Sequence, residues 1–75
     1  MHIKIGTMIA SLRVKHGIQQ KDFALMIKQS VSYLSQIENN NRKPSHKLLI
    51  EIVKNLEITL ERFIILLIRD SYPKN

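Results

Sequence analysis

The sequence predicts an all-α fold of five short helices in one small domain. Three observations support this prediction. Apolar residues recur at i, i+3, i+4 and i+7 spacing in several segments. No stretch alternates apolar and polar residues for long enough to indicate a strand. A chain of 75 residues has room for a single domain. We expect that domain to span residues 1–71, with residues 72–75 as a flexible tail.

The first helix is predicted over residues 3–15. Gly17 should end this helix, because glycine readily adopts the left-handed conformation that closes a helix C-terminus. The apolar face of the helix is formed by Ile5, Met8, Ile9 and Leu12.

Two short helices of about eight and nine residues are predicted next. The second helix begins near Gln19 or Gln20, and the third follows a break at residues 28–30. Ser30 should cap the third helix, because its hydroxyl oxygen can accept a hydrogen bond from a free backbone N–H. Asparagines 39–41 should end that helix. The inward residues of the pair are Phe23, Ala24, Ile27, Leu34 and Ile37. Two short helices joined by such a break are typical of a helix-turn-helix.

Two further helices complete the predicted fold. Residues 42–44 should form a loop, because Pro44 disfavours a helical conformation before it. Ser45 is the expected cap of a fourth helix that ends at about Leu56, and Thr59 that of a fifth, about residues 60–71. The core side of the fourth helix consists of Leu48, Leu49, Ile52, Val53 and Leu56.

The fifth helix contains six consecutive apolar residues, 63–68. A small monomer can cover one stripe of such a helix, here Phe63 and Leu67 with help from Leu60 and Leu66. The remaining residues would form an exposed apolar patch, which soluble proteins seldom leave open. We therefore predict a homodimer interface; a surface for a different protein is the alternative. The predicted interface residues are Ile64, Ile65 and Ile68.

The excess positive charge lies in the first two-thirds of the chain. Residues 1–47 contain eight Lys and Arg and two Asp and Glu (8 − 2 = +6), whereas residues 48–75 contain four of each (4 − 4 = 0). This distribution indicates a surface that faces a polyanion such as double-stranded DNA. A basic surface without a partner is the alternative.

The sequence gives no indication of catalysis or of a bound cofactor. It contains no cysteine, no glycine-rich phosphate loop and no Ser-His-carboxylate motif. His2, His16 and His46 do not have the spacing of metal ligands. The first residues do not resemble a secretory leader, and the longest apolar run, six residues, is far short of the ~20 that span a bilayer. We expect a cytoplasmic protein that is not an enzyme and needs no metal, cofactor or membrane.

Residues 12–63 resemble the lambda-repressor, Cro and XRE-type helix-turn-helix family. The spaced pattern covers about 50 of the 75 residues. It departs from the family at Asn40 and Lys28, where glycine is usual or frequent. Asparagine tolerates the left-handed conformation, whereas lysine at the inter-helix turn suggests a slightly different turn. The matching residues are Arg13, Gly17, Gln20, Ala24, Ser30, Ile37, Glu38, Asn39, Arg42, Pro44 and Ser45.

The resemblance implies a lambda-repressor-like domain whose second and third helices form the helix-turn-helix. It implies a partly buried salt bridge between Arg13 and Glu38. The positions that match DNA base contacts are Val31, Ser32, Tyr33 and Gln36, and those that match phosphate contacts are Gln20, Asn41, Arg42 and Lys43. Chemically, the Tyr33 hydroxyl could instead meet a phosphate, and each predicted base contact could be a solvated side chain.

The implied function is that of a sequence-specific transcription regulator, of the repressor or controller type. Such a protein binds a pseudo-palindromic operator as a homodimer through the major groove. The alternative is an antitoxin-like or other protein-interaction module that uses the apolar fifth helix.

Overall fold

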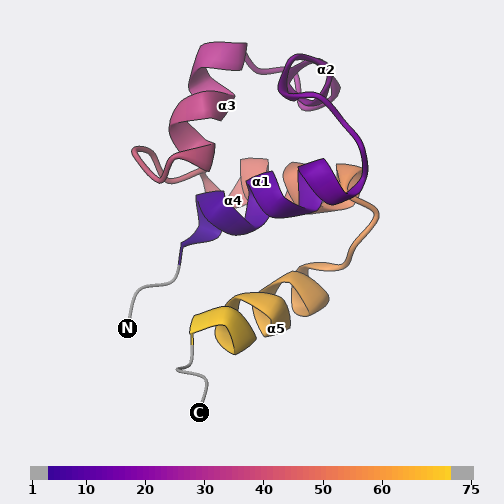
Figure 1. The fold of residues 1–75 in the computed structure, drawn as a ribbon, viewed down its shortest axis with the longest axis vertical. Coiled ribbons are helices and arrows are strands. Elements are labelled where there is room, and N and C mark those ends of the chain that lie inside the picture. Colours follow the sequence, from indigo (N-terminus) through magenta and orange to yellow (C-terminus); the bar gives the residue numbers. More distant parts are fainter. Residues whose placement is uncertain (1–3, 72–75) are drawn as a thin grey trace.

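The computed structural model describes residues 4–71, which fold into five α-helices and no strand (Figure 1). The predicted all-α class is therefore confirmed for this part of the chain. The predicted tail at 72–75 and the predicted helix start at residue 3 lie outside the described residues. The helices are α1 (Ile5–Lys15), α2 (Gln20–Met26), α3 (Val31–Glu38), α4 (His46–Asn55) and α5 (Leu60–Ser71).

Three helices begin with a side-chain cap at the position that the sequence predicted. Ser30 Oγ accepts a hydrogen bond from the Tyr33 backbone N–H at 3.0 Å at the start of α3. The corresponding bonds are Leu48 N–H to Ser45 Oγ for α4 and Arg62 N–H to Thr59 Oγ1 for α5, each 3.1 Å. These caps satisfy amides that have no partner within the helix, and they fix where each helix begins.

The first four helices each end at a left-handed residue: Gly17, Lys28, Asn40 and Glu57, with φ between +55° and +71°. Each end has the same two backbone hydrogen bonds; at α2, Lys28 N–H donates to Leu25 O and Gln29 N–H to Ala24 O, at 3.1 and 2.9 Å. This pair of bonds defines a Schellman motif. Lys28 has φ +58° and takes part in the same turn as the residues that end the other helices. The expectation that lysine changes the inter-helix turn is therefore wrong.

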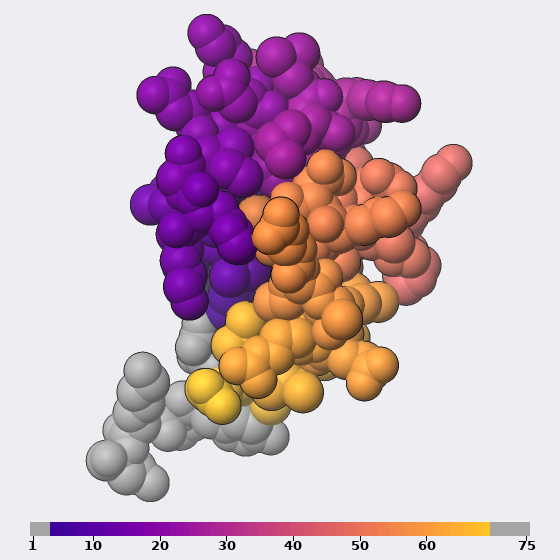
Figure 2. All heavy atoms as spheres, turned by 90° about the vertical axis from the view of Figure 1, so that its right-hand side faces the viewer, coloured from indigo at the N-terminus to yellow at the C-terminus, as the bar shows by residue number. Residues whose placement is uncertain are grey.

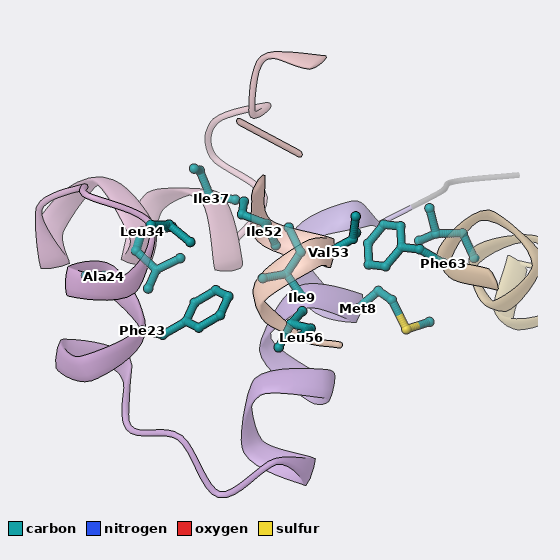
Figure 3. Close-up of a cluster of buried hydrophobic side chains, with 12 residues drawn as sticks. Met8, Ile9, Phe23, Ala24, Leu34, Ile37, Ile52, Val53, Leu56 and Phe63 are labelled. Carbon is teal, nitrogen blue, oxygen red and sulfur yellow. The ribbon is translucent and has the colours of Figure 1, made fainter. Parts of the chain in front are cut away.

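The core draws residues from all five helices (Figure 3). Phe23 and Ala24 of α2 lie next to Leu34 of α3, and Phe63 extends from α5 toward Met8 and Val53. Residues 48 and 49, predicted for the core, pack against it while only partly buried. The buried apolar residues are Met8, Ile9, Phe23, Ala24, Ile27, Leu34, Ile37, Ile52, Val53, Leu56, Phe63 and Leu67.

The helices are arranged so that α2 and α5 lie at opposite ends of the long axis (Figure 1). Both α1 and α2 pack against α3, and α4 packs against α5. The α3 helix is thus held by two neighbours on one side. Within residues 4–71, no helix combines the length and the apolar character that crossing a bilayer requires.

Candidate nucleic-acid interface

The α3 helix has one buried face and one exposed face. Leu34 and Ile37 are completely buried against α1 and α2. Of the predicted base-contacting residues, Ser32 and Gln36 are exposed, Val31 is 43% exposed and Tyr33 is half-buried. An amphipathic helix supported on its inner face in this way presents a rigid outer face, as a recognition helix must.

An ion pair connects the end of α3 to α1. Arg13 Nε donates to Glu38 Oε2 at 2.7 Å and Arg13 Nη2 donates to Glu38 Oε1 at 3.1 Å, so the contact is bidentate. The two side chains are only 13% and 5% exposed. Arg13 Nη1 also donates to Ile18 O at 2.7 Å, beyond the end of α1. Bidentate charge-assisted bonds of this kind are strong and directional, and they orient α1 against α3.

The same carboxylate also holds Gln20, the first residue of α2. Gln20 Nε2 donates to Glu38 Oε1 at 2.9 Å, and the side chain is half-buried. A primary amide has two N–H groups, so one remains available in this arrangement. The N-cap of α2, Gln19, makes no side-chain cap bond. The buried carboxylate of Glu38, at the end of α3, is therefore hydrogen-bonded to side chains of both α1 and α2.

Asn40 connects the loop after α3 to the start of α1. Gly6 N–H donates to Asn40 Oδ1 at 2.9 Å, and Asn40 Nδ2 donates to Thr7 Oγ1 at 2.8 Å. The N-cap of α1, Lys4, makes no side-chain cap bond, so Asn40 supplies one from a distant element. The sequence did not predict this contact, since Asn40 was interpreted only as a helix end and as a replacement for the family's glycine.

A basic hollow of about 260 Å³ lies beside the α3–α4 loop, residues 39–45. Its lining includes three cationic residues and no acidic one within the part of the chain that the structure describes. Asn41, Arg42 and Lys43, predicted to contact phosphates, are all exposed in this loop. The lining residues are Lys4, Ile5, Gly6, Asn40, Arg42, Lys43 and Pro44.

Arg42 turns back from this loop onto α3. The Arg42 Cζ lies 5.2 Å from the centroid of the Tyr33 ring, a cation–π distance. The predicted phosphate contact and the predicted base contact thus touch each other. No sequence pattern links the two residues, because their approach depends on how the loop leaves the helix.

The exposed apolar patch of α5 lies away from this surface. Ile64, Ile65 and Ile68 are 45%, 48% and 44% exposed. Figures 1 and 2 place α5 at the end of the molecule opposite α2. Among residues 4–71, no three potential metal ligands lie close enough together to hold an ion.

Comparison with known proteins supports the interpretation of α2 and α3. A family model described as helix-turn-helix matches residues 9–63. The restriction-modification controller protein C.Esp1396I is 30% identical, with a TM-score of 0.86 over 97% of this chain and 94% of that chain. The nucleoprotein complex of C.Esp1396I matches at 30% identity and TM-score 0.84, over 96% and 94% of the two chains.

A second regulator shares the fold alone. The clp gene regulator ClgR from Corynebacterium glutamicum has a TM-score of 0.86 at 21% identity, over 96% of this chain and 94% of that chain. No curated protein sequence matches the chain.

The fold and its supported, outward-facing α3 define a helix-turn-helix domain. The chain belongs to the XRE and lambda-repressor-like helix-turn-helix family. It is accordingly a DNA-binding transcription regulator.

Proposed function

We propose that this regulator binds a pseudo-palindromic operator as a homodimer, with α3 of each protomer in the major groove. The observation that carries the proposal is the division of α3 into a fully buried face and an exposed face with four potential base contacts. The nucleoprotein complex of C.Esp1396I, a relative at 30% identity, supports DNA as the partner. Likeness to that controller protein favours a repressor or controller type of regulator.

The exposed side chains of α3 suit different base edges. The Gln36 amide can bond adenine N6 and N7 at once, and Ser32 can donate or accept a single bond. Val31 can contact a thymine methyl group. Tyr33 can place its ring against a base or its hydroxyl on a phosphate. These four side chains span about one and a half turns of α3, so they would cover a few consecutive base pairs.

Phosphate contacts would fix the register of α3 on the duplex without specifying sequence. Lys43 and Asn41 are exposed in the α3–α4 loop and can meet one strand. Gln20 can use its second amide N–H at the start of α2 while the first stays on Glu38. Gln20 is bonded to Glu38, the last residue of α3, so the phosphate contacts proposed for α2 and for the loop would lie near the same end of α3.

The homodimer would form through Ile64, Ile65 and Ile68 of α5. A two-fold axis makes such a patch complementary to itself. It would also place two recognition helices about one DNA turn, ~34 Å, apart. The proposal gives the protein no catalytic activity and no cofactor. The same exposed patch favours a second candidate, an antitoxin-like protein that binds a different protein through α5.

Selection of bound fragments from random duplex DNA, at near-physiological salt, tests the proposal. We expect enrichment of an inverted repeat whose half-site centres are about ten base pairs apart. Binding without enrichment would leave only non-specific affinity for DNA, and would contradict the proposed function.

Substitutions at two exposed residues distinguish a base contact from a phosphate contact. Gln36→Ala should cost about 1–3 kcal/mol on the selected operator and relax the preference at one base position. Lys43→Ala should weaken binding to every sequence and make the log–log salt dependence shallower by about one unit. Titration of both variants against the operator and a scrambled duplex measures these effects. An equal loss on both duplexes for Gln36→Ala would argue against a base contact.

A further inference from the structure

We infer that Arg42 is a specificity-determining residue: held on the ring of Tyr33, it contacts a guanine base and not a phosphate. The inference rests on the proposed function, since it requires α3 to lie in the major groove. It changes the role that the family resemblance implies for Arg42, and it gives Tyr33 a positioning role.

Two contacts orient Arg42, one at its backbone and one at its guanidinium. The Arg42 backbone N–H donates to Gln36 O at 3.2 Å, which holds the main chain against the last turn of α3. The guanidinium carbon lies 5.2 Å from the Tyr33 ring centroid, and Tyr33 belongs to the first turn of α3. The side chain therefore runs back along α3, toward the residues proposed to contact bases, instead of extending outward from the loop.

The guanidinium keeps its hydrogen-bonding capacity in this position. Within the part of the chain that the structure describes, the guanidinium contacts the Tyr33 ring. A cation–π contact uses no N–H donor. An arginine has five N–H donors in a rigid planar fork. That fork matches O6 and N7 of guanine, and this pair is the commonest specific arginine contact in the major groove.

The Tyr33 ring also reduces the cost of ordering the arginine. A free arginine loses rotamer freedom when it binds a base, which lowers affinity. An arginine whose guanidinium already lies over a half-buried ring has lost part of that freedom before DNA arrives. The contact with Tyr33 therefore favours binding by Arg42 along α3, where the proposed base contacts lie, over binding by an arginine extended from the loop.

Arg42→Lys tests this inference, because it keeps the charge and removes the planar fork. The variant and the unmodified protein would be titrated against the selected operator and against duplexes in which each base pair is replaced in turn. We expect about tenfold weaker binding to the operator, with lost discrimination at one G·C pair and an unchanged salt slope. Unchanged base preferences would overturn the inference, because a phosphate contact tolerates lysine.

Two substitutions at Tyr33 test its positioning role. Tyr33→Leu removes the ring and should relax the preference at the same G·C pair as Arg42→Lys, whereas Tyr33→Phe keeps the ring and should keep that preference. A Tyr33→Leu variant that folds normally by circular dichroism and still discriminates that pair would overturn the positioning role. If the unmodified protein selects no operator, the proposed function fails and the inference with it; if it does and Arg42→Lys changes nothing, only the inference fails.

Discussion

Lys28 and Asn40 occupy the same left-handed position at the ends of α2 and α3, but only Asn40 uses its side chain there. Asn40 makes two hydrogen bonds to the start of α1. Lys28 has φ +58° and is exposed. For most residues other than glycine this conformation costs about 1–2 kcal/mol, and asparagine tolerates it better. Asn40 thus has a smaller cost and gains tertiary contacts, whereas at Lys28 only the backbone bonds of the turn offset the cost.

Lys28→Gly should therefore stabilise the protein. Glycine relieves the left-handed strain, but it also gains freedom in the unfolded chain, so we expect a net increase of about 0.5–1 kcal/mol in the free energy of unfolding. Urea denaturation followed by circular dichroism measures the change. Asn40→Gly is the matched control: it relieves less strain, because asparagine tolerates this conformation, and it removes the acceptor of the Gly6 N–H, so it should give no net gain. Equal stabilisation by both substitutions would show that the Asn40 bonds contribute nothing.

The crossing of α1 and α3 depends on Gly6. Gly6 is buried, and a Cβ atom added there would overlap the Ile37 carbonyl oxygen of α3. Glycine is usually unfavourable inside a helix, so this one serves close approach of two backbones. Separating the helices would also disturb the Asn40 bond to the Gly6 amide.

Gly6→Ala should lower the free energy of unfolding by about 1–3 kcal/mol, even though alanine has the higher helix propensity, because backbone atoms cannot move aside as a flexible side chain can. Chemical denaturation measures the loss. Ser11→Ala, at an exposed position of the same helix, is the control and should change stability little. A Gly6→Ala protein as stable as the unmodified one would show that the two helices separate at little cost.

The helices were largely predictable because each is specified by residues close in sequence. The caps Ser30, Ser45 and Thr59 and the stop at Gly17 act within a few residues, and α3, α4 and α5 begin where these caps predict. The contacts between Asn40 and Gly6 and between Arg42 and Tyr33 were not predictable. They arise from the path of the α3–α4 loop, which no local pattern encodes. The residues predicted to contact DNA followed from the family resemblance, whereas the contact between Arg42 and the Tyr33 ring required the fold.

The α5 helix joins the core through Phe63 and Leu67 and leaves three isoleucines uncovered. Ile65→Glu places a charge in the centre of this patch and should yield monomers at micromolar concentration, since an unpaired charge opposes burial between two protomers. Sedimentation equilibrium in the absence of DNA measures the mass. Leu25→Glu, at a residue of α2 that is 72% exposed, is the control and should leave the mass unchanged.

The outcome for the unmodified protein also separates the two candidate functions. A dimer that Ile65→Glu dissociates supports the homodimeric regulator. A dimer that persists in Ile65→Glu places the interface elsewhere. A monomeric unmodified protein that a different protein stabilises through α5 supports the antitoxin-like candidate instead.

The bond from Gly6 N–H to Asn40 Oδ1 has a consequence for local opening of the chain. The first turn of α1 cannot exchange that amide proton with solvent while Asn40 stays in place, and Asn40 belongs to the same loop as Arg42 and Lys43. A ligand that immobilises the loop consequently also suppresses fraying of α1, by ordinary thermodynamic linkage. Conversely, fraying of the first turn of α1 breaks the bonds of Gly6 and Thr7 to Asn40, and so loosens the α3–α4 loop. The beginning of the described chain and the α3–α4 loop thus share one opening equilibrium, although 34 residues separate the two bonded positions.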